Sequence, residues 1–260
     1  MSKVNFKSVV VTNTETITPN MQRITLEAES LKQFDLDCEG NYIKLLFSQS
    51  GETDLSQLQD NERPVMRTYT IRRFLPQQNQ IELDVVRHIT QDQHCGFAAR
   101  WAASVKTGDT INISGPGNIV SMKLEADWFF MAADMTSLPA LSAKIRKLPQ
   151  DASGYAVIKV LSEEDIQLLQ QPKNMEVIWV TDDTPLADKV KTLPWQAGEV
   201  SVWCACEFDD MRQLRQYFRN EQEVTRDNIY ISSYWKQGVT EDGHKVIKRQ
   251  DAQQQESVTQ

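Results

Sequence analysis

The sequence RTYTIR at residues 67–72 decides the fold that we expect for this chain. Threonine, tyrosine and isoleucine favour extended structure, so the run predicts a short β-strand. Side chains alternate along a strand, and one face therefore carries Arg67, Tyr69 and Ile71. The opposite face carries Thr68, Thr70 and Arg72. Such a strand places fixed cations, an aromatic ring and hydroxyl groups within a few residues of one another.

These groups suit a flavin nucleotide. A diphosphate is bound well by a bidentate guanidinium, a flavin ring stacks on an aromatic side chain, and the polar edge of the ring accepts hydrogen bonds from short donors. The same six residues are also typical of an ordinary edge strand, in which threonine and tyrosine are common and arginine is a frequent charge. The hexapeptide alone leaves both interpretations open.

Four segments in order give the chain a family resemblance. Residues 67–70 resemble the Arg-x-Tyr-Ser/Thr signature of the ferredoxin-reductase-like flavoproteins, and the longer form ending at Arg72 is similar to that of the siderophore-interacting proteins, which are FAD-dependent ferric-siderophore reductases. The further matching segments are 88–102, which ends in GFAARWA; GD at 108–109 followed by GPG at 115–117; and WCACE at 203–207 followed by YWKQG at 234–238.

The start of a predicted helix at residues 97–105 adds a second phosphate-binding feature. The free amides and partial positive charge of a helix N-terminus favour phosphate, although many helices begin with a similar sequence. In the family the matching segment wraps the FAD diphosphate, which implies this role for Gly96, Ala98 and Ala99. Phe97 stands where the family usually has proline, and it therefore supplies one more amide.

The resemblance implies that FAD carries the chemistry and that no side chain is a catalytic acid, base or nucleophile. His88, at the end of a predicted strand, matches a histidine beside the flavin in the family; a histidine bonded to the backbone would fit the sequence equally well. The cofactor-binding residues that we expect are Arg67, Thr68, Tyr69, Thr70, Arg72, Val86, His88, Gly96, Ala98, Ala99, Thr136, Glu207, Tyr234 and Trp235.

Two segments depart from the family pattern. Residues 132–140 resemble the Gly-Asp-Glu-Thr-x-x-Pro-Ala turn that leads nicotinamide phosphate onto a helix, but Ala133 and Met135 replace the glycine and the glutamate. A plain strand–helix turn capped by Thr136 or Ser137 is the alternative. In the second segment Cys206 replaces the usual glycine before the matching Glu207, and a redox role for the pair Cys204 and Cys206 is a further alternative.

Basic residues near the C-terminus are candidates for binding an anionic iron chelate in an acidic protein, although a solvated charged face is the commoner meaning of such a run. Arg146 is a further candidate for the same pocket. The substrate-binding residues that we expect are Lys44, Lys236, Lys245, Lys248 and Arg249.

The chain is long enough for two domains. Residues 1–122 are expected to form an antiparallel flavin-binding β-barrel, and residues 123–235 a parallel-sheet nicotinamide-binding-like α/β domain. Residues 236–260 are a basic segment with a disordered end. The expected strands are 9–17, 23–26, 42–47, 67–74, 81–86, 110–113, 128–132, 155–160, 177–180, 200–204 and 229–231. Helices of the second domain are expected at 137–147, 163–169, 185–192 and 209–220.

The bulk properties narrow the function classes. A net charge of −8 argues against a nucleic-acid partner, and no apolar run has the length of a membrane helix or a signal peptide. The four cysteines lack the spacing of a zinc or iron–sulfur site, so we expect no metal and reduced thiols. Reduced thiols predict a cytoplasmic protein. We also expect a monomer, although none of these features specifies the oligomeric state.

The resemblance thus implies an oxidoreductase that reduces ferric siderophores and releases ferrous iron, with FAD as cofactor and NADH or NADPH as electron donor, NADH being favoured. Two alternatives stay open. Reduced ferredoxin would replace the nicotinamide donor in the first, and the second is a non-catalytic flavin-containing siderophore carrier or sensor.

Overall fold

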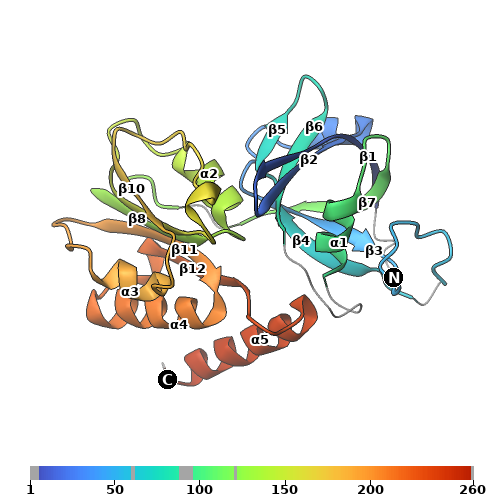
Figure 1. Cartoon of the computed structure of the whole chain (residues 1–260). Helices are drawn as coiled ribbons and strands as arrows, with labels where there is room; N and C mark the ends of the chain where they lie inside the picture. Colours follow the sequence, from blue (N-terminus) through green and yellow to red (C-terminus); the bar gives the residue numbers. More distant parts are fainter. Residues whose placement is uncertain (1–5, 60–61, 88–95, 120–121, 259–260) are drawn as a thin grey trace. The chain divides into compact units, whose positions relative to one another are not determined.

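The computed structural model describes residues 6–59, 62–87, 96–119 and 122–258, and these fall into two compact units (Figure 1). The first unit comprises Met1–Ser121, Leu138–Leu148 and Val160–Pro172. The second comprises Met122–Ser137, Pro149–Lys159 and Lys173–Gln260. The expected domains 1–122, 123–235 and 236–260 stay a prediction.

The first unit contains an antiparallel sheet with the strand order β4-β3-β7-β1-β2-β6-β5. Its strands are β1 (Lys7–Thr18), β2 (Met21–Glu27), β3 (Tyr42–Phe47), β4 (Val65–Thr70), β5 (Arg73–Leu75), β6 (Gln80–Val86) and β7 (Thr110–Gly117). β4 and β5 stand at opposite ends of this order, yet only Ile71 and Arg72 separate them in the chain. The Arg72 amide continues the ladder by donating to the Glu82 carbonyl over 2.9 Å. One chain segment therefore joins the two edge strands, so the sheet curls into a barrel-like shape.

Alternation of apolar and polar residues builds the barrel core. Along β6 the apolar residues Ile81, Leu83 and Val85 are buried, as the period of two requires. Helix α1 (Phe97–Ser104) adds Phe97 and Trp101 to the same cluster. A short 3₁₀ turn, η1 (Glu29–Gln33), buries Leu31. Residues 115–117, whose GPG sequence is typical of a tight turn, form the end of β7 instead.

The second unit contains a parallel sheet with the order β10-β9-β8-β11-β12. Its strands are β8 (Trp128–Asp134), β9 (Ser153–Lys159), β10 (Asn174–Val180), β11 (Val200–Glu207) and β12 (Ile229–Trp235). Helices α3 (Leu186–Lys191) and α4 (Phe208–Gln216) pack on the sheet over an aromatic cluster that includes Phe130 and Phe218 (Figure 1). A π-helical turn, η3 (Tyr217–Glu221), extends α4, and a 3₁₀ turn, η4 (Arg226–Asn228), leads into β12.

The C-terminal segment differs from the expectation. The structure forms a helix, α5 (Glu241–Val258), where the sequence predicted a polar segment with a disordered end. His244 Nε2 lies 2.8 Å from Ser233 Oγ, and Arg215 holds Asp251 with two hydrogen bonds of 2.7 and 2.8 Å. These polar contacts attach α5 to β12 and α4. Because polar rather than apolar residues attach the helix, its sequence lacks the apolar periodicity by which a helix is predicted.

The helix expected at 163–169 is wrong beyond residue 165. Only a 3₁₀ turn forms there, η2 (Glu163–Asp165). Asp165 is buried, and its carboxylate accepts hydrogen bonds from Thr18 Oγ1 (2.7 Å) and Asn20 Nδ2 (2.8 Å) of the barrel. Ser162 Oγ adds a third bond of 3.1 Å. These tertiary bonds to a polar side chain override the local helical pattern.

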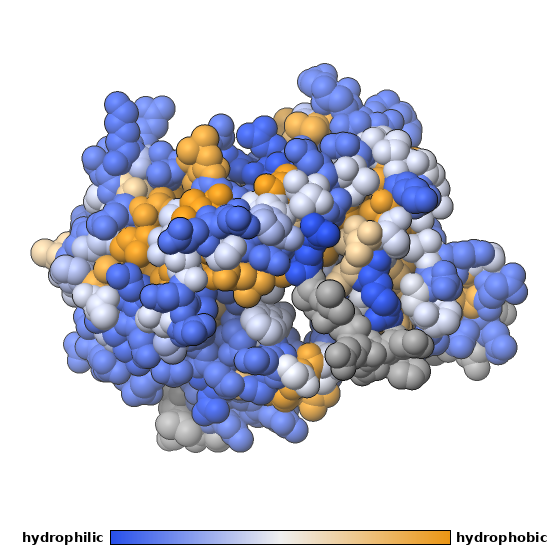
Figure 2. Space-filling model, viewed as in Figure 1, coloured by the Kyte–Doolittle hydropathy of each residue, from blue (hydrophilic) through white to orange (hydrophobic). Residues whose placement is uncertain are grey.

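The remaining helix, α2 (Leu138–Ile145), follows β8 and counts with the first unit. In the part of the chain that the structure describes, no helix combines the length and apolar character needed to cross a membrane. Figure 2 shows hydrophilic residues over most of the visible surface, with hydrophobic residues in separate patches.

Candidate functional site

Two arginines meet at the ring of Phe97. The guanidinium carbon of Arg67, from β4, lies 5.7 Å from the ring centroid. That of Arg100, one helical turn after Phe97 in α1, lies 5.1 Å from the same centroid. Arg67 is only 8% exposed and also donates from Nη1 to the Met66 carbonyl over 2.9 Å. The strand of the flavin signature and the start of α1 are therefore neighbours, although some thirty residues separate them in sequence.

The start of α1 is shaped for a close approach to its amides. Gly96 caps the helix with φ of 67°, a left-handed conformation that glycine adopts without strain. Ala98 and Ala99 are small, and both are buried, Ala98 within the core cluster of the barrel. The first amides of a helix have no acceptor within the helix. These donors and the two nearby guanidinium groups form a set whose chemistry suits a diphosphate.

Strand β4 divides the other signature residues between its two faces. Thr68 pairs with Lys44 of β3 and Tyr69 pairs with Ile43, and directly opposed residues share a face. Tyr69 packs partly against the barrel core, while Thr68 is exposed. Thr70 is buried at the end of the strand. Lys44 therefore lies on the Thr68 face and not on the face of Tyr69.

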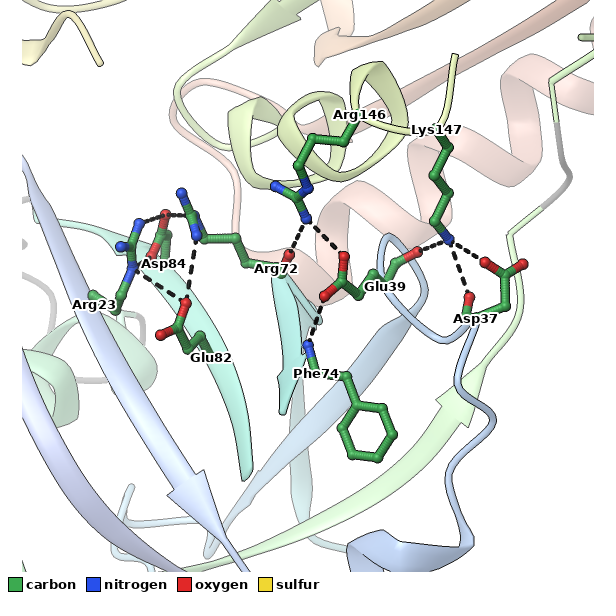
Figure 3. A network of polar contacts seen from close by, with 9 residues as sticks. All are labelled: Arg23, Asp37, Glu39, Arg72, Phe74, Glu82, Asp84, Arg146 and Lys147. Carbon is green, nitrogen blue, oxygen red and sulfur yellow. Dashed lines mark hydrogen bonds and ion pairs between the residues drawn. The ribbon is translucent and has the colours of Figure 1, made fainter. Parts of the chain in front are cut away.

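Arg72 is engaged inside the barrel wall (Figure 3). Its Nε lies 2.8 Å from Asp84 Oδ2, and its Nη1 lies 3.4 Å from Glu82 Oε2. Arg23 binds the same Asp84 carboxylate with hydrogen bonds of 2.8 and 3.0 Å. The guanidinium of Arg72 therefore has two carboxylate partners, and the cofactor contact implied by the resemblance stays a prediction.

Val86 ends β6 opposite Met21. His88 lies outside the described residues, as does Cys95.

In the second unit, Asp134 organises the turn after β8. Its Oδ1 accepts from the Thr136 amide (2.9 Å) and hydroxyl (2.6 Å), and its Oδ2 accepts from Trp235 Nε1 (2.7 Å). Ser137 Oγ bonds to the carbonyl of Ala205 in β11. Burial raises the pKa of Asp134, and the hydrogen bonds oppose this effect. The expected residues Thr136 and Trp235 are thus brought together by a carboxylate that the sequence did not single out.

Glu207 caps helix α4. Its carboxylate accepts from the amide of Asp209, from that of Asp210 (3.4 Å) and from that of Gln237 (3.0 Å). The first two bonds cap the helix, and the bond from Gln237 ties the end of β11 to the chain that follows β12. On β12, Tyr234 is half-buried, but its hydroxyl is buried, and this burial raises the pKa of the phenol well above the ordinary value.

The two cysteines of β11 are poor candidates for thiol chemistry. Cys204 and Cys206 are fully buried, with their sulfur atoms 4.0 Å apart. The neighbouring Cys204 thiol and burial both raise the pKa of Cys206 well above its ordinary value, which disfavours the reactive thiolate. Within the described ranges, no group of three or more histidine, cysteine, aspartate or glutamate side chains could hold a metal ion.

Most of the expected substrate-binding cations already have partners within the protein. Lys236 Nζ bonds to both carboxylate oxygens of Asp209 at 2.9 Å. Lys245 pairs with Glu241 and Asp242 of its own helix at 3.3 and 3.1 Å. Lys248 donates to Ser232 Oγ (2.6 Å) and to the Ser233 carbonyl (3.1 Å).

Arg249 is exposed on α5. Arg146 is bound to Glu39 at 2.8 Å in the first unit.

Comparison with known proteins identifies the family. Residues 10–120 match the model of the siderophore-interacting FAD-binding domain, and residues 126–238 match that of the siderophore-interacting protein. The ferric vibriobactin reductase ViuB of Vibrio cholerae serotype O1 is 31% identical over 244 residues, which cover 88% of each chain. The chain belongs to the siderophore-interacting protein family.

Two further similar proteins agree with this assignment. The ferric acinetobactin reductase of Acinetobacter baumannii is 25% identical over 198 residues, covering 74% of this chain and 68% of the relative. The crystal structure of the siderophore-interacting protein SipS from Aeromonas hydrophila superposes with a TM-score of 0.84 at 28% identity, covering 96% of this chain and all of the other. The expected fold, an antiparallel barrel and a parallel α/β sheet, is confirmed.

Sequence reasoning missed Asp134, Arg100 and Glu39. Asp134 stood inside a recognised motif, and its position after a buried strand was the available signal. Arg100 follows Phe97 at helical spacing, but no sequence feature placed it near Arg67. Glu39 carried no signal, because its partners come from distant parts of the chain.

Proposed function

We propose that this protein is an FAD-dependent oxidoreductase that reduces ferric siderophores and thereby releases ferrous iron. The observation that carries the proposal is the meeting of Arg67 and the start of α1 at Phe97, inside the segment that matches an FAD-binding domain. The two relatives named as ferric vibriobactin reductase and ferric acinetobactin reductase support the same activity.

The chain's own groups divide the work of holding the cofactor. Arg67 neutralises the diphosphate, and the amides at the start of α1, from Gly96 to Ala99, donate hydrogen bonds to it. Tyr69 offers its ring for stacking, and the hydroxyls of Thr68 and Thr70 donate to polar edges. When bound, FAD supplies the acceptance of a hydride and the transfer of single electrons to iron(III).

Further cofactor contacts are proposed for Arg72, Val86, His88, Glu207, Tyr234 and Trp235. Thr136 would contact the donor's phosphate at the turn after β8, where Asp134 fixes its amide and hydroxyl. No protein group needs to move a proton to the metal chelate, because the reduction of iron(III) is an electron transfer. The protein's task is to position the flavin, to exclude solvent from it and to attract the ferric chelate.

The electron donor that we favour is NADH. Ala133 and Met135 replace the glycine and the acidic residue expected in this turn, so reduced ferredoxin is the alternative. A carrier or sensor that binds the chelate without turnover is the second alternative. Cytoplasmic location and a monomeric state belong to the same proposal.

An anionic ferric chelate needs local positive charge, because the whole protein carries a net charge of −8. Among the expected cations, Lys44, Lys236, Lys245, Lys248 and Arg249, the structure provides internal acceptors for Lys236, Lys245 and Lys248. We therefore propose that Lys44 and Arg249 contribute most to attraction, and the other three contribute less.

The proposal is tested first on the cofactor. The purified protein should be yellow, and the cofactor released by heat should run as FAD in chromatography. Release of FMN would contradict the diphosphate site, and a colourless protein that cannot be reconstituted with FAD would contradict the proposed function. Steady formation of iron(II) with an electron donor then separates the reductase from a carrier.

A further inference from the structure

The junction between β4 and β5 directly follows the residues proposed to contact the flavin. Here the chain leaves its partner β3 and turns to pair with β6, so its backbone groups lose the regular ladder. The Ile71 amide donates to the Asn41 carbonyl, and the Ile71 carbonyl accepts from the Gly40 amide, each over 2.8 Å. The Arg72 amide donates to the carbonyl of Glu82 over 2.9 Å.

Two side chains complete this set of hydrogen bonds. Arg146, which follows helix α2, donates from Nη2 to the Arg72 carbonyl over 3.0 Å and to Glu39 Oε2 over 2.8 Å. Glu39 Oε1 in turn accepts from the Phe74 amide over 3.0 Å. Figure 3 shows this chain of contacts running from the helix end through Glu39 and Arg72 into the barrel wall.

The pair formed by Glu39 and Arg146 is well shielded from solvent. Their side chains are 23% and 15% exposed. A partly buried charged pair that also satisfies backbone groups orders its surroundings more strongly than a surface ion pair does. Removal of either side chain leaves the Arg72 carbonyl or the Phe74 amide without its partner.

A neighbouring ion pair, Lys147 with Asp37, also bonds to backbone carbonyls but is more exposed. Lys147, the next residue, bonds to Asp37 Oδ1 over 2.6 Å and to the carbonyls of Asp37 and Glu39. The Asp37 side chain is 83% exposed, and none of these three bonds of Lys147 reaches Ile71 or Arg72 at the β4–β5 junction. Exposed pairs of this kind contribute little to stability. Lys147 is therefore the matched control for Arg146.

We propose that Glu39 and Arg146 are positioning residues that fix the β4–β5 junction and, through it, the flavin contacts of Tyr69 and Thr70. This inference rests on the proposed function, since it assumes that β4 carries the flavin. Thr70 precedes the junction directly, so a shift of Ile71 and Arg72 displaces the strand end. Neither positioning residue needs to touch the cofactor.

The test compares Arg146→Gln with Lys147→Gln in the full-length protein. Each variant is freed of flavin and titrated with FAD at a temperature where circular dichroism shows it folded. Arg146→Gln should raise the dissociation constant of FAD at least about tenfold and change the visible circular dichroism of the bound flavin. Lys147→Gln should change the dissociation constant less than about twofold. Arg146→Lys, which can still donate to one acceptor, should fall between them.

A loss of thermal stability in Arg146→Gln without a change in FAD affinity or flavin circular dichroism would overturn the proposal, because the contact would then be merely structural. Equal effects of both variants would overturn it as well. Hydrogen exchange in the flavin-free proteins separates this result from a failure of the proposed function. The amides of Arg72 and Phe74 should exchange faster in Arg146→Gln and at the wild-type rate in Lys147→Gln, whatever the cofactor.

Discussion

Trp235 Nε1 donates a hydrogen bond of 2.7 Å to Asp134 Oδ2. The two residues end β12 and β8, which are separated in the sheet by β11. The bond therefore spans the carboxyl ends of three parallel strands, the edge at which ligands bind in open α/β sheets. It joins an aromatic residue proposed to lie at the cofactor with the turn proposed to receive the donor.

Asp134→Asn should alter the pH dependence of stability. Burial raises the pKa of Asp134 above its usual value of 3.8, despite the hydrogen bonds from Thr136, Trp235 and Ser137. Between the two pKa values the folded chain retains a proton that the unfolded chain releases. The contribution of Asp134 to the free energy of unfolding is therefore present below the usual pKa and is lost as pH rises through the raised pKa. Asp134→Asn has no carboxyl group at this position, so its stability does not show this loss.

The melting temperature of Asp134→Asn relative to wild type should therefore increase from about pH 4 to about pH 8. Trp235→Phe removes a hydrogen bond that lowers the pKa of Asp134. In this variant the loss of stability with rising pH should therefore extend to higher pH than in wild type. A difference between Asp134→Asn and wild type that stays constant across this range would contradict the expected titration of Asp134.

Arg67→Ala should lose most of its affinity for FAD. The guanidinium is almost fully buried beside Phe97, and removing a charged donor from a phosphate costs roughly 2–4 kcal/mol. Titration of the flavin-free protein should show a dissociation constant raised by a factor of roughly 30 to 1,000. Arg73→Ala, on β5 of the same sheet, is the control and should bind normally. Wild-type affinity in Arg67→Ala would remove this arginine from the site.

Charge reversal should separate the exposed cation of α5 from the paired one. Arg249→Glu should raise the KM for an anionic catecholate chelate several-fold and leave that for a neutral hydroxamate nearly unchanged. Lys245→Glu should have a smaller effect, since Glu241 and Asp242 already lie beside this lysine. Added salt should shrink the difference, because the Debye length is about 8 Å at physiological ionic strength. Unchanged catecholate kinetics at low salt in Arg249→Glu would place the substrate elsewhere.

Asp165→Ala should destabilise the first unit. The substitution leaves Thr18 Oγ1 and the side chain of Asn20 without their acceptor, which costs about 2–4 kcal/mol. Burial alone would raise the pKa of Asp165, but the bonds from Asn20, Thr18 and Ser162 outweigh it and lower the pKa below 3.8. The wild-type stabilisation should thus be present above about pH 4 and be lost as pH falls further.

Chemical unfolding of Asp165→Ala and wild type, once above and once below about pH 4, measures the difference in their free energies of unfolding. Asp165→Asn, which keeps one acceptor oxygen, should recover part of the loss. Equal stability of Asp165→Ala and wild type at neutral pH would show that the buried carboxylate does not stabilise the contact of η2 with Thr18 and Asn20.

The sequence predicted the elements whose signal is local. Strict alternation marked β6, and continuous apolar runs marked β8 and β11. Helix α5 was missed because polar bonds from His244 and Asp251 dock it, and polar residues give no amphipathic stripe. The false helix at 163–169 failed for a related reason, since the buried carboxylate of Asp165 is satisfied only by residues of the barrel.

The candidate site follows the same division. Arg67 and the start of α1 were recognisable from their motifs, but the ring of Phe97 between two arginines appears only in three dimensions. The internal partners of Lys236 and Arg146 lie 27 and 107 residues away in the chain. Such long-range pairs have no signature in a single sequence, so free and engaged cations look alike there.

The most direct test of the account is anaerobic stopped-flow spectroscopy of the FAD-loaded protein, followed by mixing with a ferric siderophore. NADH should bleach the flavin absorbance, NADPH and reduced ferredoxin serving as comparison donors, and the siderophore should then restore it while a ferrous-specific chelator records two iron(II) per flavin. Flavin that is bleached by a donor but not reoxidised by any ferric siderophore, with no iron(II) formed, would contradict the proposed reductase.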